Sequence, residues 1–278
     1  MRRCYESMSK KHLSIPYIVW MIIFVLIPLA LILVYGVTTS DGAFTLDNIL
    51  AIAQPEHRKA LALSFLLSLI STGICLILSY PLAIILDKLS VNKNSFIVFL
   101  FILPMWMNFL LRTMAWQNIL ERNGLLNRFL EFLHLPALNL INTPFAIILG
   151  MVYNFLPFMI LPIYNSLIRI DKDVINAAHD LGASDSYTFR KIIFPLTLPG
   201  VMSGILMVFI PSMTTFVISD LLGGGKILLI GNVIEQEFKQ TNNWNLGAGL
   251  SLVLMLFILF SMVIDAVYDK DKGEKGLW

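Results

Sequence analysis

A run of three glycines and a lysine, Gly223 to Lys226, is the stretch of this sequence that first suggests chemistry. Glycine-rich loops that end in lysine can cradle the phosphates of a nucleotide. That motif also needs a glycine five residues before the last glycine and a serine or threonine after the lysine. These two positions hold Asp220 and Ile227, so the match fails. We therefore expect no ATP site in this chain, and we expect the glycines to turn the backbone.

The other reactive side chains show no catalytic or metal-binding arrangement. Three of the four histidines, His57, His134 and His179, lie in expected loops, and the two cysteines, Cys4 and Cys75, are far apart. No nucleophile and base recur at a useful spacing, and a hydrolase acting inside the membrane would need paired ionisable residues at mid-bilayer depth. The sequence therefore predicts a protein that is not an enzyme and that binds no cofactor or metal itself.

The elements that carry these residues are membrane spans. Of 278 residues, 57% are hydrophobic and 14% charged, whereas soluble domains are near 45–50% apolar and about 25% charged. The excess lies in blocks long enough to cross a bilayer, which takes about 20 apolar residues. The sequence predicts an all-α polytopic membrane protein, and the net charge of +2 gives no reason to expect nucleic acid. We expect six transmembrane helices, at 15–37, 61–86, 96–116, 144–167, 199–221 and 245–268.

The distribution of lysine and arginine predicts the orientation. The two ends of the chain and the loops near 87–95 and 168–198 carry 13 of these residues, and the other three loops carry 7. The positive-inside rule then places both termini in the cytoplasm, in agreement with an even number of spans. On the outer side, apolar spacing in 125–135 predicts a short amphipathic helix, and 226–238 predicts another.

The long cytoplasmic loop is expected to form two short capped helices. Asp171 can cap the first helix, Gly182 can end it, and Ser184 can cap the second, which Pro195 should stop. One face of the first helix carries small or apolar residues, namely Val174, Ala177, Ala178 and Leu181. A small surface lets another backbone approach closely, so this face could dock a partner. The plain alternative is an ordinary amphipathic loop helix.

The same loop carries a recognisable motif. Asn176-Ala177-Ala178, followed by Gly182 and by Ile192 to Pro195, resembles the motif of permease subunits of ABC importers. Asn176 replaces the glutamate of the motif, and Phe194 replaces a leucine. In that family the loop is the coupling helix that docks on the nucleotide-binding subunit. The resemblance implies ATPase contacts for a set of six residues: Asn176, Ala177, Ala178, Asp180, Leu181 and Gly182.

Longer stretches extend the resemblance to one branch of the family. Residues 101–116, 156–167, 181–200 and 219–234 look like the B-type permease of spermidine/putrescine importers. The likeness implies a type I ABC importer permease (MetI-like) fold, with a single domain over 1–278, a core at 60–268 and a coupling-helix loop at 169–198. It also implies a cell-membrane location and several partners: two ATPase subunits that bind ATP and Mg, a second homologous permease, an extracytoplasmic polyamine-binding protein and membrane lipid.

For a polyamine cargo, five residues are candidates for the solute path. Aromatic faces attract cations, and amide or carboxylate oxygens accept hydrogen bonds from ammonium groups. The candidates are Trp106, Asn108, Tyr153, Asn154 and Asp220. Alternatively, Trp106 belongs to an interfacial aromatic belt, Asn154 ties two helices together, and Asp220 is a solvated helix end or pairs with Lys226. Because the spans do not show several acids, we expect a low-affinity conduit whose selectivity resides in an external binding protein.

Two other functions remain open from the sequence. A permease of the same superfamily for another solute, such as an oxyanion, would favour a basic lining, which the spans do not show. A stand-alone ion-coupled transporter would show paired half-helices and inverted symmetry, and it would leave the capped cytoplasmic segment without a role.

Overall fold

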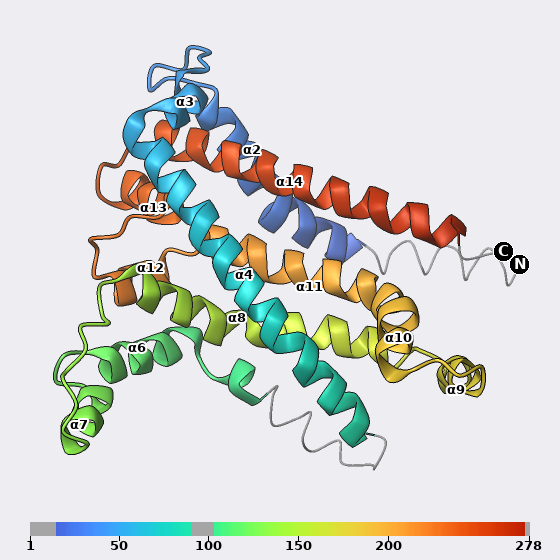
Figure 1. Cartoon of the computed structure of the whole chain (residues 1–278). Coiled ribbons are helices and arrows are strands. Elements are labelled where there is room, and N and C mark those ends of the chain that lie inside the picture. The colour runs from blue at the N-terminus through green and yellow to red at the C-terminus, as the bar shows by residue number, and fades with distance from the viewer. Residues whose placement is uncertain (1–14, 91–102, 276–278) are drawn as a thin grey trace, which may run out of the picture. The chain divides into compact units, whose positions relative to one another are not determined.

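The computed structural model describes residues 15–90 and 103–275, which are almost entirely helical (Figure 1). Within these residues the described β pairing is a single bridge between Thr38 and Phe44. Backbone contacts divide the chain into two compact units. The first comprises Met1–Arg58 and Ile234–Phe257, and the second comprises Lys59–Val233 and Ile258–Trp278.

The first unit is built on two apolar helices. One is the helix Ile15–Gly36, which includes the π turn η1 (Ile22–Leu26) and α2 (Ile27–Gly36). The other is the first part of α14 (Trp244–Lys275). The backbones pack closely, because a Cβ added to Gly36 would collide with the side chain of Leu252. Two short helices, α3 (Asp47–Leu50) and η2 (Ala51–Ala53), follow α2.

The second unit surrounds α8 (Pro144–Leu167), whose buried side chains include Ile147, Met151 and Ile163. Alongside it run α4 (Pro55–Ser90) and α11 (Phe194–Thr214) (Figure 1). Near the start of α8 lie five short elements: η3 (Leu103–Trp106), α6 (Phe109–Leu120), α7 (Leu125–Phe132), α12 (Val217–Gly223) and the start of α13 (Ile230–Lys239). At its other end lie α9 (Lys172–Asp180) and α10 (Asp185–Thr188).

The closest helix pair in this unit depends on two glycines of α11. A Cβ on Gly200 would lie 2.5 Å from the carbonyl oxygen of Pro162 in α8, and a Cβ on Gly204 would lie 2.7 Å from Met159 Sδ. The spacing Gly200-x-x-x-Gly204 is the arrangement by which membrane helices approach with their backbones in contact. Small residues therefore set the distance between α8 and α11.

Gly200→Ala is expected to destabilise the protein by about 1–3 kcal/mol, because the methyl group meets backbone that cannot move aside. A matched variant is Gly73→Ala on α4, where a Cβ would meet nothing within 4 Å. Replacing a helical glycine there should instead stabilise by about 0.5–1 kcal/mol. Thermal unfolding in detergent measures both. Equal shifts for the two variants would contradict the close approach of α8 and α11.

The predicted spans can be compared with the helices one by one. Five described helices are long and apolar enough to cross a membrane: Ile15–Gly36, Pro55–Lys88, Pro144–Leu167, Asp185–Thr214 and Trp244–Val263. They correspond to five of the six predicted spans. The predicted span at 96–116 begins outside the described residues, and its described part is η3 followed by the start of α6. The two short helices predicted within 125–135 and 226–238 are confirmed as α7 and α13, whereas their place on the outer side stays a prediction.

The prediction that Pro195 stops a helix was wrong. The helix continues from α10 through the π turn η4 (Phe189–Ile193) into α11. In this turn the N–H of Phe194 bonds to the carbonyl oxygen of Phe189, five residues back. A wider turn relieves the clash that a proline normally makes with the carbonyl four residues earlier. The fifth span therefore begins at Asp185 and ends at Thr214, rather than covering 199–221.

Candidate functional site

The α9–α10 hairpin has the caps that the sequence predicts. The Asp171 carboxylate accepts a hydrogen bond from the N–H of Asp173, and the Ser184 hydroxyl accepts one from the N–H of Tyr187. Between the helices, Gly182 has a φ of +82°, a left-handed conformation that glycine adopts at low cost. The chain therefore turns sharply and sets α9 beside α10.

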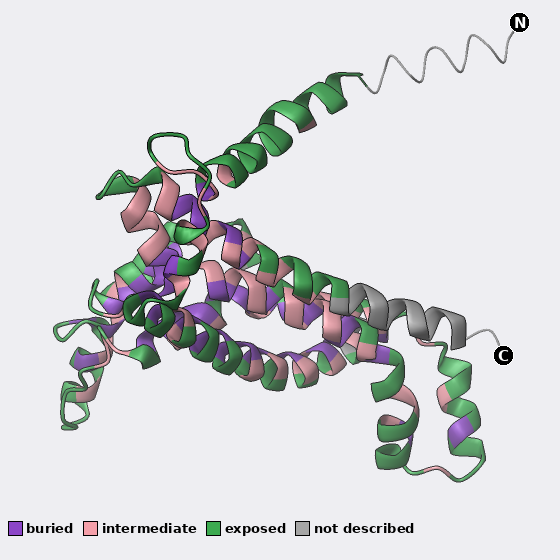
Figure 2. Ribbon diagram, turned by 90° about the horizontal axis from the view of Figure 1, so that it is seen from above, coloured by how far each residue is buried: buried purple, intermediate pink, exposed green. Residues whose placement is uncertain are grey.

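A groove of about 720 Å³ lies along this hairpin, and we call it the coupling groove. Leu181 is a large apolar side chain that is 89% exposed in the lining of this groove, whereas Ala178 is 9% exposed. Most of the hairpin is exposed (Figure 2). Val174 and Tyr187 of the groove lining are also exposed, at 46% and 57%, and exposed apolar side chains that lie together are typical of a surface that a partner covers. The groove is lined by Val174, Ala177, Ala178, Leu181, Gly182, Ala183, Ser184, Tyr187 and Ile192.

Four of the six predicted coupling residues line the coupling groove, namely Ala177, Ala178, Leu181 and Gly182. Asn176 and Asp180 are exposed on α9 outside its lining. Tyr187 was missed because only the fold brings α10 beside α9. The available signal was the position of Tyr187 three residues after Ser184, which places it in the first turn of the second helix.

The hairpin is connected to the long helices by aromatic contacts. Tyr80 of α4 packs against Phe189 and Phe194, with ring centroids 5.7 and 5.8 Å apart. Its hydroxyl forms a 2.6 Å hydrogen bond with the Thr197 hydroxyl of α11. These contacts join α4 to η4 and to the start of α11, directly after the hairpin. Sequence reasoning missed Tyr80, which lies over a hundred positions from these partners.

The structure places the five predicted path residues on four elements. Trp106 is 75% exposed at the end of η3. Asn108 caps α6, where its side-chain oxygen accepts hydrogen bonds from the N–H groups of Leu110 and Leu111. That oxygen is engaged by backbone, so it is a poorer candidate for an ammonium ligand than the sequence indicates. An asparagine just before a helix is a common N-cap, so the sequence already offered this role for Asn108.

The two candidates in α8 pack against α6. Asn154 is 1% exposed and donates hydrogen bonds to Gly150 O at 2.9 Å and to Thr113 Oγ1 at 3.3 Å. Tyr153 packs edge-on against Trp116, with ring centroids 5.3 Å apart. Asn154 thus ties two helices together, which is the alternative that the sequence left open.

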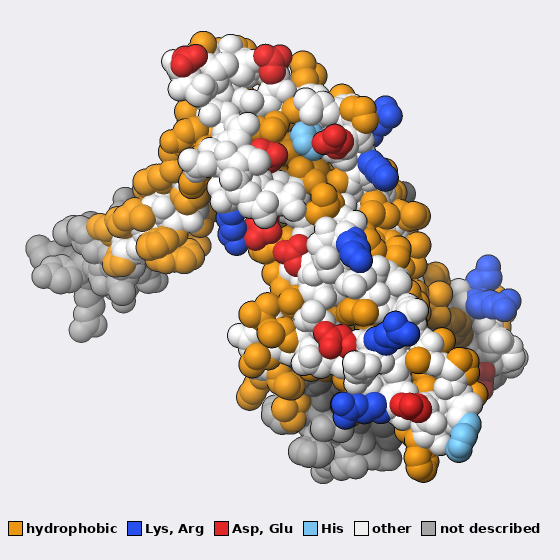
Figure 3. Space-filling view, turned by 90° about the vertical axis from the view of Figure 1, so that its left-hand side faces the viewer, with side chains coloured by type: hydrophobic (Ala, Val, Ile, Leu, Met, Phe, Trp, Pro, Cys, Tyr) orange, Lys and Arg blue, Asp and Glu red, His pale blue; other side chains and the backbone are white. Residues whose placement is uncertain are grey.

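Asp220 does not end the fifth span but lies exposed in the separate helix α12. Its carboxylate accepts a 2.6 Å hydrogen bond from the amide of Asn232. Asn232 is 1% exposed, and its oxygen accepts hydrogen bonds from the Ser219 hydroxyl and the N–H of Leu229. Asp220 is therefore held in place by a buried amide that joins α12 to α13. Figure 3 shows acidic and basic side chains on the face that it draws, among many exposed hydrophobic ones.

Five described helices long and apolar enough to cross a bilayer, together with a capped helical hairpin, are the features of a polytopic membrane protein. The sequence profile of the family described as "binding-protein-dependent transport system inner membrane component" matches residues 2–272, and the chain belongs to this family. It is an inner-membrane, multi-pass permease subunit of an ABC importer, and it is not itself an enzyme.

Within this family, the chain is similar to permeases of named transport systems. The spermidine/putrescine transport system permease protein PotB of Escherichia coli (strain K12) is 40% identical over 253 residues, covering 88% of this chain and 92% of the relative. The protein of the same name from Haemophilus influenzae is 39% identical over 261 residues, covering 91% of each chain. Among solved structures, a chain of a bacterial alginate ABC transporter in complex with an alginate-bound periplasmic protein superposes with a TM-score of 0.72. It is 15% identical and covers 94% of both chains, which supports the fold alone.

Proposed function

We propose that this chain forms the translocation path for spermidine and putrescine in an ATP-driven importer. The observation that carries the proposal is the 40% identity, over 88% of the chain, to a spermidine/putrescine permease. The chain would act with a second homologous permease, two ATPase subunits that bind ATP and Mg²⁺, and an external polyamine-binding protein. A similar chain that acts with a periplasmic protein is known in the alginate transporter.

The coupling groove is the proposed ATPase contact. Its floor is formed by alanine and glycine backbone, and its rim carries the exposed Leu181 and Tyr187. Small residues admit a partner helix, and exposed apolar or aromatic anchors contribute most of the energy at such interfaces. Asn176 and Asp180 would lie at the polar edge of the contact. ATP-driven closure of the ATPases would then move α9 and α10, and Tyr80 would pass the motion to α4.

The proposed orientation places both termini and the α9–α10 hairpin in the cytoplasm. The excess of lysine and arginine in the terminal segments and in the loops near 87–95 and 168–198 supports it. The elements near the start of α8, including α7 and α12, then lie on the outer side, where the binding protein delivers its cargo.

The function is tested by reconstituting the complex in proteoliposomes and measuring ATP hydrolysis while the binding protein is loaded with individual polyamines. We expect stimulation by loaded binding protein and no uptake by this chain alone. Uptake by the isolated chain would contradict the role as an ABC permease. Stimulation only by a different solute would contradict the substrate assignment while leaving that role intact.

Along the path, Trp106 and Asp220 remain exposed candidates for cation contact, with Asn108, Tyr153 and Asn154 close to α6 as supporting residues. Asp220→Asn removes the charge while its amide oxygen can still accept the hydrogen bond from Asn232. We expect polyamine uptake to fall by about tenfold or less, since one partly solvated charge pair contributes on the order of 1 kcal/mol.

The matched control for Asp220→Asn is Glu131→Gln on the exposed surface of α7. Assembly with the partner subunits should stay normal in both variants. Unchanged uptake kinetics in Asp220→Asn would mean that this acid is only a solvated residue of α12.

A further inference from the structure

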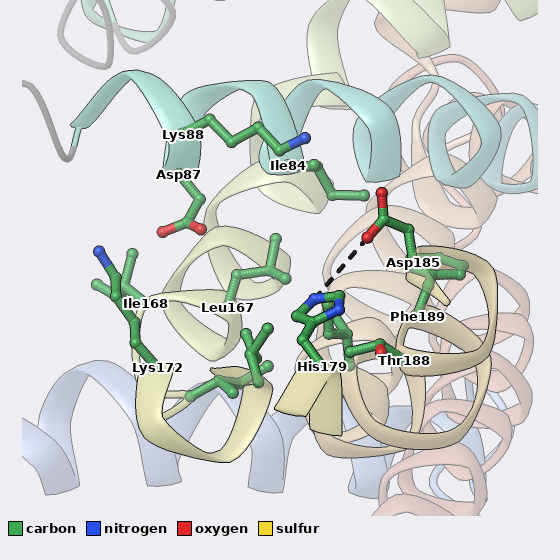
Figure 4. A pocket seen from close by; sticks show the side chains of 13 residues that line it. Ile84, Asp87, Lys88, Leu167, Ile168, Lys172, His179, Asp185, Thr188 and Phe189 are labelled. Atoms are coloured by element: carbon green, nitrogen blue, oxygen red, sulfur yellow. Dashed lines mark ion pairs between the residues drawn. The ribbon is translucent and has the colours of Figure 1, made fainter. Parts of the chain in front are cut away.

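A second cavity, of about 440 Å³, adjoins a different face of α9 from the one that lines the coupling groove (Figure 4). Its walls come from the last turns of α4 and α8, from α9, and from the α10–η4 segment. The apolar helices Pro55–Lys88, Pro144–Leu167 and Asp185–Thr214 each have one end at this cavity. It therefore lies where three helices that are long and apolar enough to cross a membrane come to an end.

The interior of this cavity is apolar. Ile84, Leu167 and Ile193 lie on three different helices and face it together with Ile168, Ile170, Ile175 and Phe189. A free inorganic anion or a hydrated cation would gain no favourable contact with these apolar side chains. A ligand with a hydrocarbon portion would cover them and gain the free energy of burying apolar surface.

The charges at the mouth are unequally satisfied. The Asp185 carboxylate lies 3.8 Å from Nε2 of His179, and Asp87 also has an interaction partner. Lys88 and Lys172 are exposed and form no ion pair with any residue that the structure describes. The lining holds two lysines and two aspartates, and the two lysine ammonium groups are those without an ion pair among the described residues, so a ligand's phosphate could contact them. Basic pockets between membrane helices on the cytoplasmic side are known sites for anionic lipid headgroups.

Of the described residues that have a buried polar atom without a hydrogen-bond partner, Thr188 is the one that lines this cavity. Thr188 lines the cavity and is 1% exposed, and its hydroxyl has no hydrogen-bond partner among the described residues. Buried hydroxyls are almost always paired, because an unpaired one loses its hydrogen bonds to water without replacement. A ligand that brings hydrogen-bonding oxygen into the cavity would satisfy it.

We propose that this cavity binds an anionic phospholipid. Lys88 and Lys172 contact the phosphate, the Thr188 hydroxyl bonds to a headgroup or ester oxygen, and the isoleucine and leucine side chains cover the start of an acyl chain. Because α9 forms one wall, the bound lipid would also fix the hairpin against α4. The site goes beyond the proposed transport function and does not depend on which solute is carried.

The test uses the purified complex in nanodiscs of phosphatidylcholine alone or mixed with phosphatidylglycerol, with retained lipid measured by native mass spectrometry. We expect selective retention of phosphatidylglycerol, weakened about fivefold by each of Lys88→Gln and Lys172→Gln. Lys191→Gln is the matched control, because this exposed lysine lies on η4 and does not line the cavity. Equal retention in the double variant and in the control would overturn the proposal.

Thr188→Val is an independent test, because it should raise thermal stability without lipid and lower the retention of phosphatidylglycerol. Replacing an unpaired buried hydroxyl with a methyl group of similar size should raise the melting temperature in phosphatidylcholine. The same change should weaken retention of phosphatidylglycerol, because the lipid loses a hydrogen bond. A variant that is destabilised without lipid, or that retains lipid fully, contradicts the assignment. Full displacement of the lipid by soluble glycerol phosphate would show that the site binds the free anion instead.

Discussion

An Ala177→Trp variant is expected to reach the membrane at normal levels and to lose ATP-driven uptake by about tenfold or more. Ala177 lies exposed in the lining of the coupling groove, so an indole there need not disturb the hairpin itself. It would fill the space that a partner helix must enter, and losing about 1.4 kcal/mol of docking free energy already weakens binding tenfold. ATP hydrolysis by the complex should then stop responding to loaded binding protein.

Ala177 is a better position for this test than its neighbour Ala178. Ala178 is only 9% exposed, and its carbonyl oxygen accepts a hydrogen bond from the N–H of Ala183 across the turn. A large side chain there would displace α10 as well as the partner. Asp173→Trp places the same indole at an exposed site on α9 outside the groove. Comparable loss of uptake in both tryptophan variants would argue against docking in the groove.

Asn232→Leu is expected to lower the free energy of unfolding by about 2–4 kcal/mol, because each buried polar group left without a hydrogen-bond partner costs about 1–3 kcal/mol. The amide of Asn232 hydrogen bonds to Asp220 and Phe216 O, and its oxygen accepts from Ser219 and the N–H of Leu229. Leucine can form none of these hydrogen bonds. Phe216 O, the N–H of Leu229 and the Ser219 hydroxyl would each lose the partner that this side chain provides.

The measurement is thermal or denaturant unfolding of the detergent-solubilised protein, followed by helical circular dichroism. Gln236→Leu is the matched control, one turn further along α13 and only partly buried. We expect it to change stability by less than about 0.5 kcal/mol, as surface substitutions usually do. If Asn232→Leu proved as stable as this control, the amide would not hold α12 and Asp220 in place.

The spans and the hairpin could be predicted because their signals are local. An apolar run identifies a helix by itself, and Asp171, Gly182 and Ser184 each define a cap within a few residues. The end of the fifth span was predicted wrongly, because the residue composition does not show where the helix stops. Thr215, with a ψ of +137°, ends the helix within a polar but unremarkable stretch, and α12 starts only at Val217.

The candidate path was harder, because sequence does not specify which way a side chain in a span points. Arg112 illustrates this, since it lies near one end of the predicted span 96–116, where a charged side chain is expected to face the membrane surface. In the structure it is 6% exposed, and its neighbour Thr113 contacts Asn154 in the middle of α8. The lipid cavity is a similar case, because Lys88 and Lys172 are brought together only by tertiary packing.

The uninterrupted helix from Asp185 to Thr214 has a mechanical consequence. Its 30 residues form a rod about 45 Å long, with Tyr187 in the coupling groove near one end and α12 just beyond the other. If the rod pivots near the groove, a tilt of roughly 5° carries its distant tip sideways by about 4 Å. A break at Pro195 would have absorbed that motion, whereas the π turn keeps the helix continuous. In the proposed importer, a small stroke at the coupling groove would thereby become a larger displacement beside α12 and Asp220.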